Sequence, residues 1–129
     1  MRPVMIWITV PDARQAAAIT DALLAEKLVA CVSAVRDLHS RYWWKGTCAT
    51  AAEILLTAKS MSVNVRAIIR RVKELHAYEV PEIVVIPITA GNPAYLRWLR
   101  SSIVVPGKKR PGRTTRAGRS DNRRKGLPS

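Results

Sequence analysis

Two apolar periodicities alternate along this chain, and their order limits the possible folds more than any other feature of the sequence. Apolar residues at every second position are typical of a strand, and apolar residues at every third or fourth position are typical of an amphipathic helix. The strand pattern occurs in residues 4–10, 29–35, 53–59 and 82–88, and the helical pattern in residues 12–28 and 62–75. The sequence therefore predicts the order strand, helix, strand, strand, helix, strand. Residues 36–46 are expected to end the second strand and form a hairpin, with residues 42–46 near its turn.

Capping residues indicate where the helices begin. Asp12 is a good N-cap, and Gln15 three residues later would complete a capping box. Ser62 is expected to cap the second helix. Asn92 followed by Pro93 predicts a short third helix that ends near Ser102.

This order of elements is that of the split βαβ, or ferredoxin-like, arrangement of the α+β class, here with an added C-terminal helix. Its two main helices shield only one face of a four-stranded sheet. Residues 82–88 are nevertheless apolar at nearly every position, which is typical of a strand covered on both faces, and Trp7, Trp43 and Trp44 also need cover. Because a small monomer rarely exposes so large an apolar patch, we expect self-association.

The chain divides by charge into a domain of residues 1–104 and a basic tail of residues 105–129. The tail holds nine Lys or Arg and one acid, so it carries +8 of the net charge of +13. Its Pro, Gly, Arg, Ser and Thr content predicts disorder. Such a tail would bind polyanions without sequence preference, or it would be a solvated extension with no dedicated role.

Several classes of function lack their sequence signatures. The chain has no P-loop, no dinucleotide-binding glycine loop, no CxxC or HExxH zinc motif, and no phenylalanine for an RNA-recognition sheet. No apolar run approaches the roughly 18 residues of a membrane span. Two cysteines make a poor disulfide framework, and there is no signal-peptide pattern at the N-terminus. We expect a cytoplasmic protein that is not an enzyme and does not enter membranes.

One turn concentrates the groups that could bind a proton or a metal. His76, Tyr78, Glu79 and Glu82 lie within seven residues, between the second predicted helix and the last predicted strand. Pro81 forbids helix there and stiffens the connection. Imidazole and carboxylate are ligands suited to Cu(II) or Zn(II). The competing interpretation is structural: His76 ends the helix, and the carboxylates form salt bridges.

Five ordered motifs in this chain resemble the divalent-cation tolerance protein family CutA. They are Ile8–Asp12, Ala25–Val32, Tyr42–Gly46, Val72–Glu82 and Gly91–Leu99. The resemblance covers residues 3 to about 102. It implies a ferredoxin-like protomer in a tight homotrimer, similar in build to the PII signalling proteins. It also implies a link to tolerance of copper and other divalent ions, with no established enzymatic reaction.

The chain departs from the family pattern in and near the same turn. The family usually has proline where this chain has Ala77, and several acids where it has residues 47–52, of which none is acidic. Some bacterial members have a Cys-His-His set assigned to copper. The matching positions here are Ile8, Leu75 and His76, so one ligand of three remains.

Two functions follow from these observations. The first is a homotrimeric metal-responsive protein that binds Cu(II) or another divalent ion weakly through His76, Glu79 and Glu82. The alternative is a PII-like sensor of a small molecule or nucleotide. Its ligand would occupy a cleft between protomers lined by Cys31, Lys59 and Tyr78, with His76 and Glu82 nearby.

Overall fold

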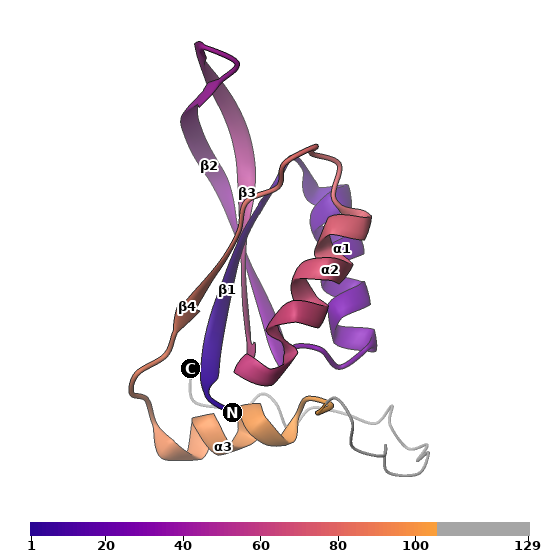
Figure 1. Ribbon diagram of the computed structural model, residues 1–129, viewed down its shortest axis with the longest axis vertical. Coiled ribbons are helices and arrows are strands. Elements are labelled where there is room, and N and C mark those ends of the chain that lie inside the picture. Colours follow the sequence, from indigo (N-terminus) through magenta and orange to yellow (C-terminus); the bar gives the residue numbers. More distant parts are fainter. Residues whose placement is uncertain (106–129) are drawn as a thin grey trace.

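A computed structural model of the protein describes residues 1–105, which form one sheet and three α-helices (Figure 1). The predicted tail, apart from Val105, lies outside the described residues. In chain order the elements are β1 (Pro3–Val10), α1 (Ala13–Ala25), β2 (Cys31–Trp44), β3 (Thr47–Met61), the 3-10 turn η1 (Ser62–Asn64), α2 (Val65–Leu75), β4 (Ile83–Pro87) and α3 (Pro93–Ser101).

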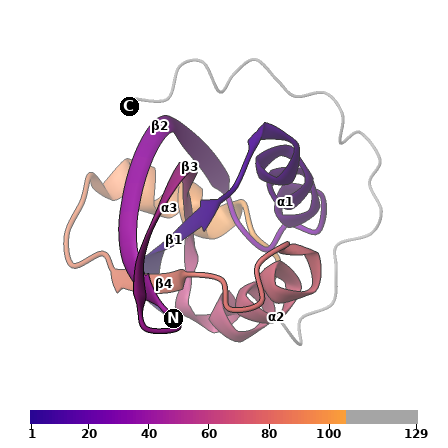
Figure 2. The same ribbon diagram turned by 90° about the horizontal axis from the view of Figure 1, so that it is seen from above.

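The four strands form an antiparallel sheet in the order β2-β3-β1-β4. The helices α1 and α2 lie side by side on one face of this sheet (Figure 2). The element order and the sheet topology confirm the predicted ferredoxin-like α+β fold.

The main core lies between the sheet and these two helices. Val4, Ile6, Ile8 and Val10, the alternate residues of β1, are all buried, as the strand periodicity predicts. They pack with the apolar stripes of the two helices, which contribute Ile19 and Leu23 from α1 and Ile68 and Val72 from α2. Each buried aliphatic side chain of this kind contributes about 1.5–3 kcal/mol to the free energy of unfolding.

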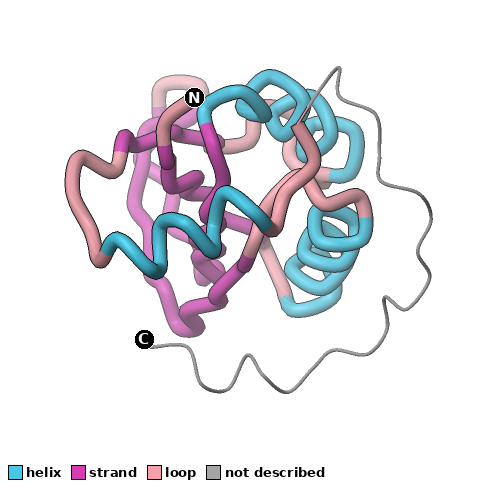
Figure 3. The backbone as a smooth tube through the Cα atoms, turned by 90° about the horizontal axis from the view of Figure 1, so that it is seen from below, coloured by secondary structure: helices cyan, strands magenta, loops and turns pink. Residues whose placement is uncertain are grey.

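The helix α3 lies apart from α1 and α2, across the end of the sheet where β1 begins (Figure 3). Its Leu99 packs with Met61 and Ile103 in a second, smaller core. The predicted cap is confirmed: the Asn92 side chain accepts a hydrogen bond of 3.0 Å from the Ala94 N–H, and Pro93 is the first helical residue.

The hairpin of β2 and β3 turns within the predicted residues 42–46, between the end of β2 at Trp44 and the start of β3 at Thr47. The third strand was predicted only from residue 53, so β3 begins earlier than expected. The register shifts between Val35 and Leu38, and the two strands then continue past the end of β1 as a two-stranded arm (Figure 1). Small, polar and aromatic side chains are mixed in this arm, so it lacks the strict apolar alternation that identifies a half-buried strand.

The predicted cap at Asp12 is confirmed, but its capping box and the predicted cap at Ser62 are wrong. Asp12 does accept a hydrogen bond from the Gln15 N–H at 2.9 Å, but the Gln15 side chain bonds the 75–77 turn and does not close a capping box. Ser62 does not cap α2. Its hydroxyl accepts a hydrogen bond from the Arg2 N–H, and the α-helix starts only after the 3-10 turn. The side chains of Gln15 and Ser62 instead form hydrogen bonds with residues that are distant in the sequence. Local spacing does not predict such bonds.

One face of β4 is uncovered within the protomer, as expected for a sheet whose two main helices shield only one face. Val84 and Ile86 have 46% and 36% of their surface exposed. They pair with Trp7 and Met5 of β1, on the face opposite α1 and α2. Trp43, near the tip of the arm, is 76% exposed. The apolar pattern is therefore present, but a single chain does not bury it.

Candidate functional site

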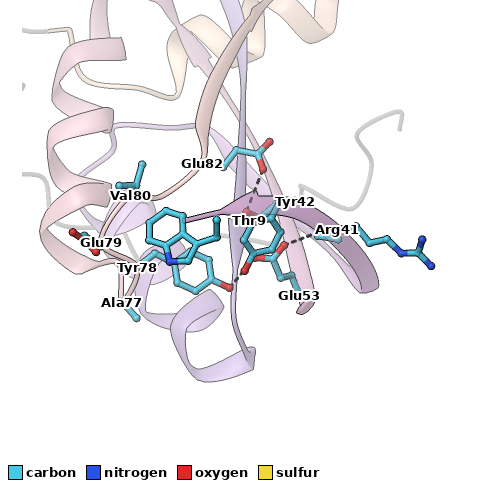
Figure 4. Close-up of a pocket in the computed structure, with 11 residues that line it drawn as sticks. Thr9, Arg41, Tyr42, Glu53, Ala77, Tyr78, Glu79, Val80 and Glu82 are labelled. Carbon is cyan, nitrogen blue, oxygen red and sulfur yellow. Dashed lines mark hydrogen bonds between the residues drawn. The ribbon is translucent and has the colours of Figure 1, made fainter. Parts of the chain in front are cut away.

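A cavity of about 720 Å³ lies where the predicted turn meets the arm (Figure 4). The turn, residues 76–82, joins α2 to β4 and runs past the end of β1. The arm supplies the other side of the cavity. The lining residues are Thr9, Ser40, Arg41, Tyr42, Trp44, Glu53, Ala77, Tyr78, Glu79, Val80 and Glu82.

Glu53 is the most buried acid in this cavity, with 8% of its surface exposed. The Ser40 hydroxyl donates to its Oε1 at 2.7 Å, and the Tyr78 hydroxyl donates to its Oε2 at 2.7 Å. No Lys, Arg or His of residues 1–105 forms an ion pair with it. Arg41 also lines the cavity, but its side chain extends away from Glu53 (Figure 4). Glu53 is thus a buried carboxylate without a counter-charge in the described protomer.

Sequence reasoning missed this role of Glu53. The strand pattern of residues 53–59 assigns Glu53 no role beyond the start of a strand. The available signal was its place in a run of apolar and small residues, where a charged side chain needs partners. Those partners, Ser40 and Tyr78, are 13 and 25 residues away in the sequence, so spacing alone could not identify them.

Tyr78 acts as a hydrogen-bond donor in this site. Burial of its phenol raises its pKa well above the ordinary value of 10, and the hydrogen bond to Glu53 and the charge of that carboxylate raise the pKa further. The phenol therefore keeps its proton at neutral pH. It stabilises the Glu53 carboxylate and is not available as an anionic ligand.

The His76 side chain links the turn to β1 through hydrogen bonds of its two ring nitrogens. Its Nδ1 accepts a hydrogen bond of 3.1 Å from the Tyr78 N–H, so a neutral ring carries its proton on Nε2. That nitrogen lies 2.8 Å from the Thr9 carbonyl oxygen, to which it donates. The ring also contacts Tyr78, with 4.8 Å between centroids. Both ring nitrogens are therefore engaged within the protomer.

The predicted metal ligands only partly converge. Glu79 and Glu82 line the cavity, and the Thr9 hydroxyl donates to Glu82 at 3.4 Å. His76 does not line the cavity. Within residues 1–105, no group of three or more His, Cys, Asp or Glu side chains is arranged to hold a metal ion.

The predicted small-molecule pocket is also divided within one protomer. Cys31 and Lys59 are direct partners across β2 and β3, and the Cys31 sulfur lies 3.6 Å from the Tyr95 hydroxyl. Lys59 is six residues along β3 from Glu53, or about 20 Å at the rise of a strand. Tyr78 lies at the Glu53 end, so these three residues do not line one cavity in a single chain.

Taken together, the fold and the site define a ferredoxin-like α+β protomer with a bare apolar sheet face and an acidic, aromatic cavity beside it. No helix in residues 1–105 is long and apolar enough to cross a membrane. The family model described as "CutA1 divalent ion tolerance protein" matches residues 4–102. The chain belongs to this family.

Individual relatives agree with this assignment. The divalent-cation tolerance protein CutA of Thermus thermophilus is 44% identical over 98 residues, which are 76% of this chain and 95% of that protein. The chloroplastic protein CutA 1 of rice is 38% identical over 99 residues, which are 77% of this chain but only 56% of that longer protein.

Solved structures share the fold. The crystal structure of CutA from Xylella fastidiosa superposes with a TM-score of 0.78 at 36% identity, covering 81% of this chain and 100% of that one. The structure of CutA1 from Oryza sativa has a TM-score of 0.77 at 37% identity and covers 79% of this chain and 94% of that one.

Proposed function

We propose that this protein is a homotrimeric, non-enzymatic, cytoplasmic divalent-metal-responsive protein that binds Cu(II) weakly. The observation that carries the metal response is the match of nearly the whole described domain to a divalent ion tolerance family. The bare face of β4 and β1 supports self-association, because Val84 and Ile86 are left half-exposed in one chain.

The turn supports weak binding at His76, Glu79 and Glu82. A metal needs an imidazole lone pair, and both nitrogens of His76 are engaged, with Tyr78 and with Thr9. Binding must therefore break at least one of these hydrogen bonds. Within residues 1–105 no three His, Cys, Asp or Glu side chains are arranged to hold a metal ion, whereas stable protein sites use about four ligands. Cu(II) should bind more tightly than Zn(II), because it has the higher intrinsic affinity for nitrogen and oxygen ligands.

Calorimetric titration of Cu(II) into wild type, His76→Ala and Cys31→Ser tests the site. We expect weak binding in wild type, loss of binding in His76→Ala and little change in Cys31→Ser, whose sulfur lies near Tyr95 and away from the turn. Binding should weaken in acid, because a protonated imidazole cannot ligate. Unchanged binding in His76→Ala would remove this residue from the site.

The second candidate is a PII-like sensor with an inter-subunit pocket formed by Cys31, Lys59 and Tyr78. The cavity itself favours ligand binding of some kind, because its volume of about 720 Å³ is in the range of small-molecule sites. Lys59 from a neighbouring protomer would help to bind a nucleotide, because the lining holds one cation, Arg41, and three acids. A thermal-shift panel of nucleotides against metal ions separates the two functions.

A further inference from the structure

The cavity beside the turn has a lining that suits an organic cation better than a metal ion. Its deepest charged group is Glu53, and its walls include the rings of Tyr42, Trp44 and Tyr78. A buried carboxylate loses most of its hydration and needs compensation. Within residues 1–105 that compensation comes from two hydroxyl groups and not from a cation.

The Glu53 carboxylate also has unused acceptor capacity. An ionised carboxylate can accept about four hydrogen bonds, two at each oxygen. Ser40 takes one position on Oε1, and Tyr78 takes one on Oε2. One acceptor position remains on each oxygen, which is the arrangement that two parallel N–H groups of a planar donor satisfy.

The aromatic walls favour a planar, weakly hydrated cation. A guanidinium group stacks on aromatic rings and pairs bidentately with a carboxylate, whereas an ammonium is more strongly hydrated and acts as a point charge. Arg41 of the same chain does not fill this role, because its side chain extends away from Glu53 (Figure 4). Glu82, also in the lining, adds negative charge at the mouth.

We infer that this cavity binds a guanidinium group, which pairs with Glu53 and stacks against the surrounding aromatic rings. The group has two sources: a free guanidinium compound or an arginine of the chain's own residues 106–129. That segment contains six arginines and, at up to about 80 Å when extended, is long enough to reach the cavity. This cavity shares Glu79 and Glu82 with the proposed metal site, but its central carboxylate, Glu53, is not a proposed metal ligand.

Calorimetric titration of the full-length protein with methylguanidinium tests this inference, with methylurea as the neutral analogue of the same shape. We expect saturable binding of methylguanidinium and none of methylurea. Glu53→Gln should weaken binding at least about tenfold, since it removes a charge-assisted pair. Asp21→Asn makes the same change of charge at an exposed residue of α1 outside the cavity and should have no effect.

Further variants keep the test decisive and identify the source. Tyr42→Leu, on the exposed arm, should weaken binding about two- to fivefold even if Glu53→Gln fails to fold. A full-length variant with its six tail arginines changed to glutamine should bind more tightly than wild type if the tail fills the cavity, and equally if the ligand is free. Absence of saturable binding in both proteins, equal binding of methylurea, or undiminished binding in folded Glu53→Gln would overturn the inference. These outcomes do not depend on whether His76→Ala loses Cu(II) binding. The guanidinium site and the metal site can therefore be refuted separately.

Discussion

At the scale of single residues, Glu53, Tyr78 and His76 form a connected polar network that joins three separate parts of the chain. Tyr78 donates its hydroxyl to Glu53 and its backbone N–H to His76. His76 in turn donates to the Thr9 carbonyl of β1. The turn between α2 and β4 is therefore held in place by side chains that the sequence analysis predicted as groups able to bind a proton or a metal. Their first role in the protomer is structural.

Replacing Tyr78 with Phe tests the network through its pH dependence. The variant should lose about 1 kcal/mol of stability at neutral pH, because Glu53 loses one of two donors and the site is partly exposed. Since folding raises the pKa of this phenol, its stabilising effect is complete below pH 10, the ordinary value, and is lost as pH rises above it. Urea denaturation at several pH values should show the gap between wild type and variant narrowing above pH 10. A constant gap would contradict the raised pKa.

At the scale of secondary structure elements, α1 and the turn depend on each other through Gln15. Its side chain donates to the Leu75 carbonyl and accepts from the Ala77 N–H, so it bridges the start of α1 to the end of α2. This contact replaces the predicted capping box. The N-terminus of α1 consequently determines where the turn lies, and with it one wall of the cavity.

Gln15→Ala should detach the turn without harming the helix, because alanine has the higher helix propensity. We expect a loss of about 1–2 kcal/mol for two hydrogen bonds, and faster amide exchange at Ala77 and Tyr78. Hydrogen-exchange mass spectrometry reports both positions. Arg14→Ala, an exposed neighbour on α1, is the matched control and should leave their exchange rates unchanged. Equal exchange in both variants would mean that Gln15 does not hold the turn.

At the scale of the whole molecule, the uncovered sheet face is the feature that favours self-association. Val84 and Ile86 lie beside Trp7 and Met5 on this face, and the two-stranded arm exposes Trp43. Assembly through this face and the arm would bury the apolar patch and the open strand edges.

We expect sedimentation at micromolar concentration to show a trimer with an obligate interface above about 2,000 Å². Val84→Lys should dissociate it, because it places a charge on the bare apolar face. Val63→Lys makes the same substitution at a valine of similar exposure, 40% against 46%, in the 3-10 turn, and should leave the trimer intact. A folded monomer in the wild type would refute the proposed assembly.

Removal of residues 105–129 tests the division of the chain by charge. We expect the melting temperature and the oligomeric state to stay nearly unchanged, because both cores lie within residues 4–103. Binding to DNA or heparin at low salt should largely disappear, since the tail carries +8 of the net charge of +13. Aggregation or loss of the trimer would instead assign the tail a structural role.

The sequence by itself determined the order of the elements, the sheet topology, the caps at Asp12 and Asn92, and the family. These features depend on local periodicity, on residues two or three positions apart, or on ordered motifs. It also predicted that His76, Tyr78, Glu79 and Glu82 would occupy one stiff turn.

Only the tertiary structure decided what surrounds that turn. The cavity forms because the arm extends beyond the end of β1. This extension places Glu53 next to Tyr78, although the two residues are 25 positions apart in the sequence. In the same way the tertiary structure engaged both nitrogens of His76 with Thr9 and Tyr78, and it placed Lys59 far along β3 from the end where Tyr78 lies. The physical reason is that burial and pairing of polar groups depend on which distant segments meet, whereas helix caps and apolar periods depend on near neighbours.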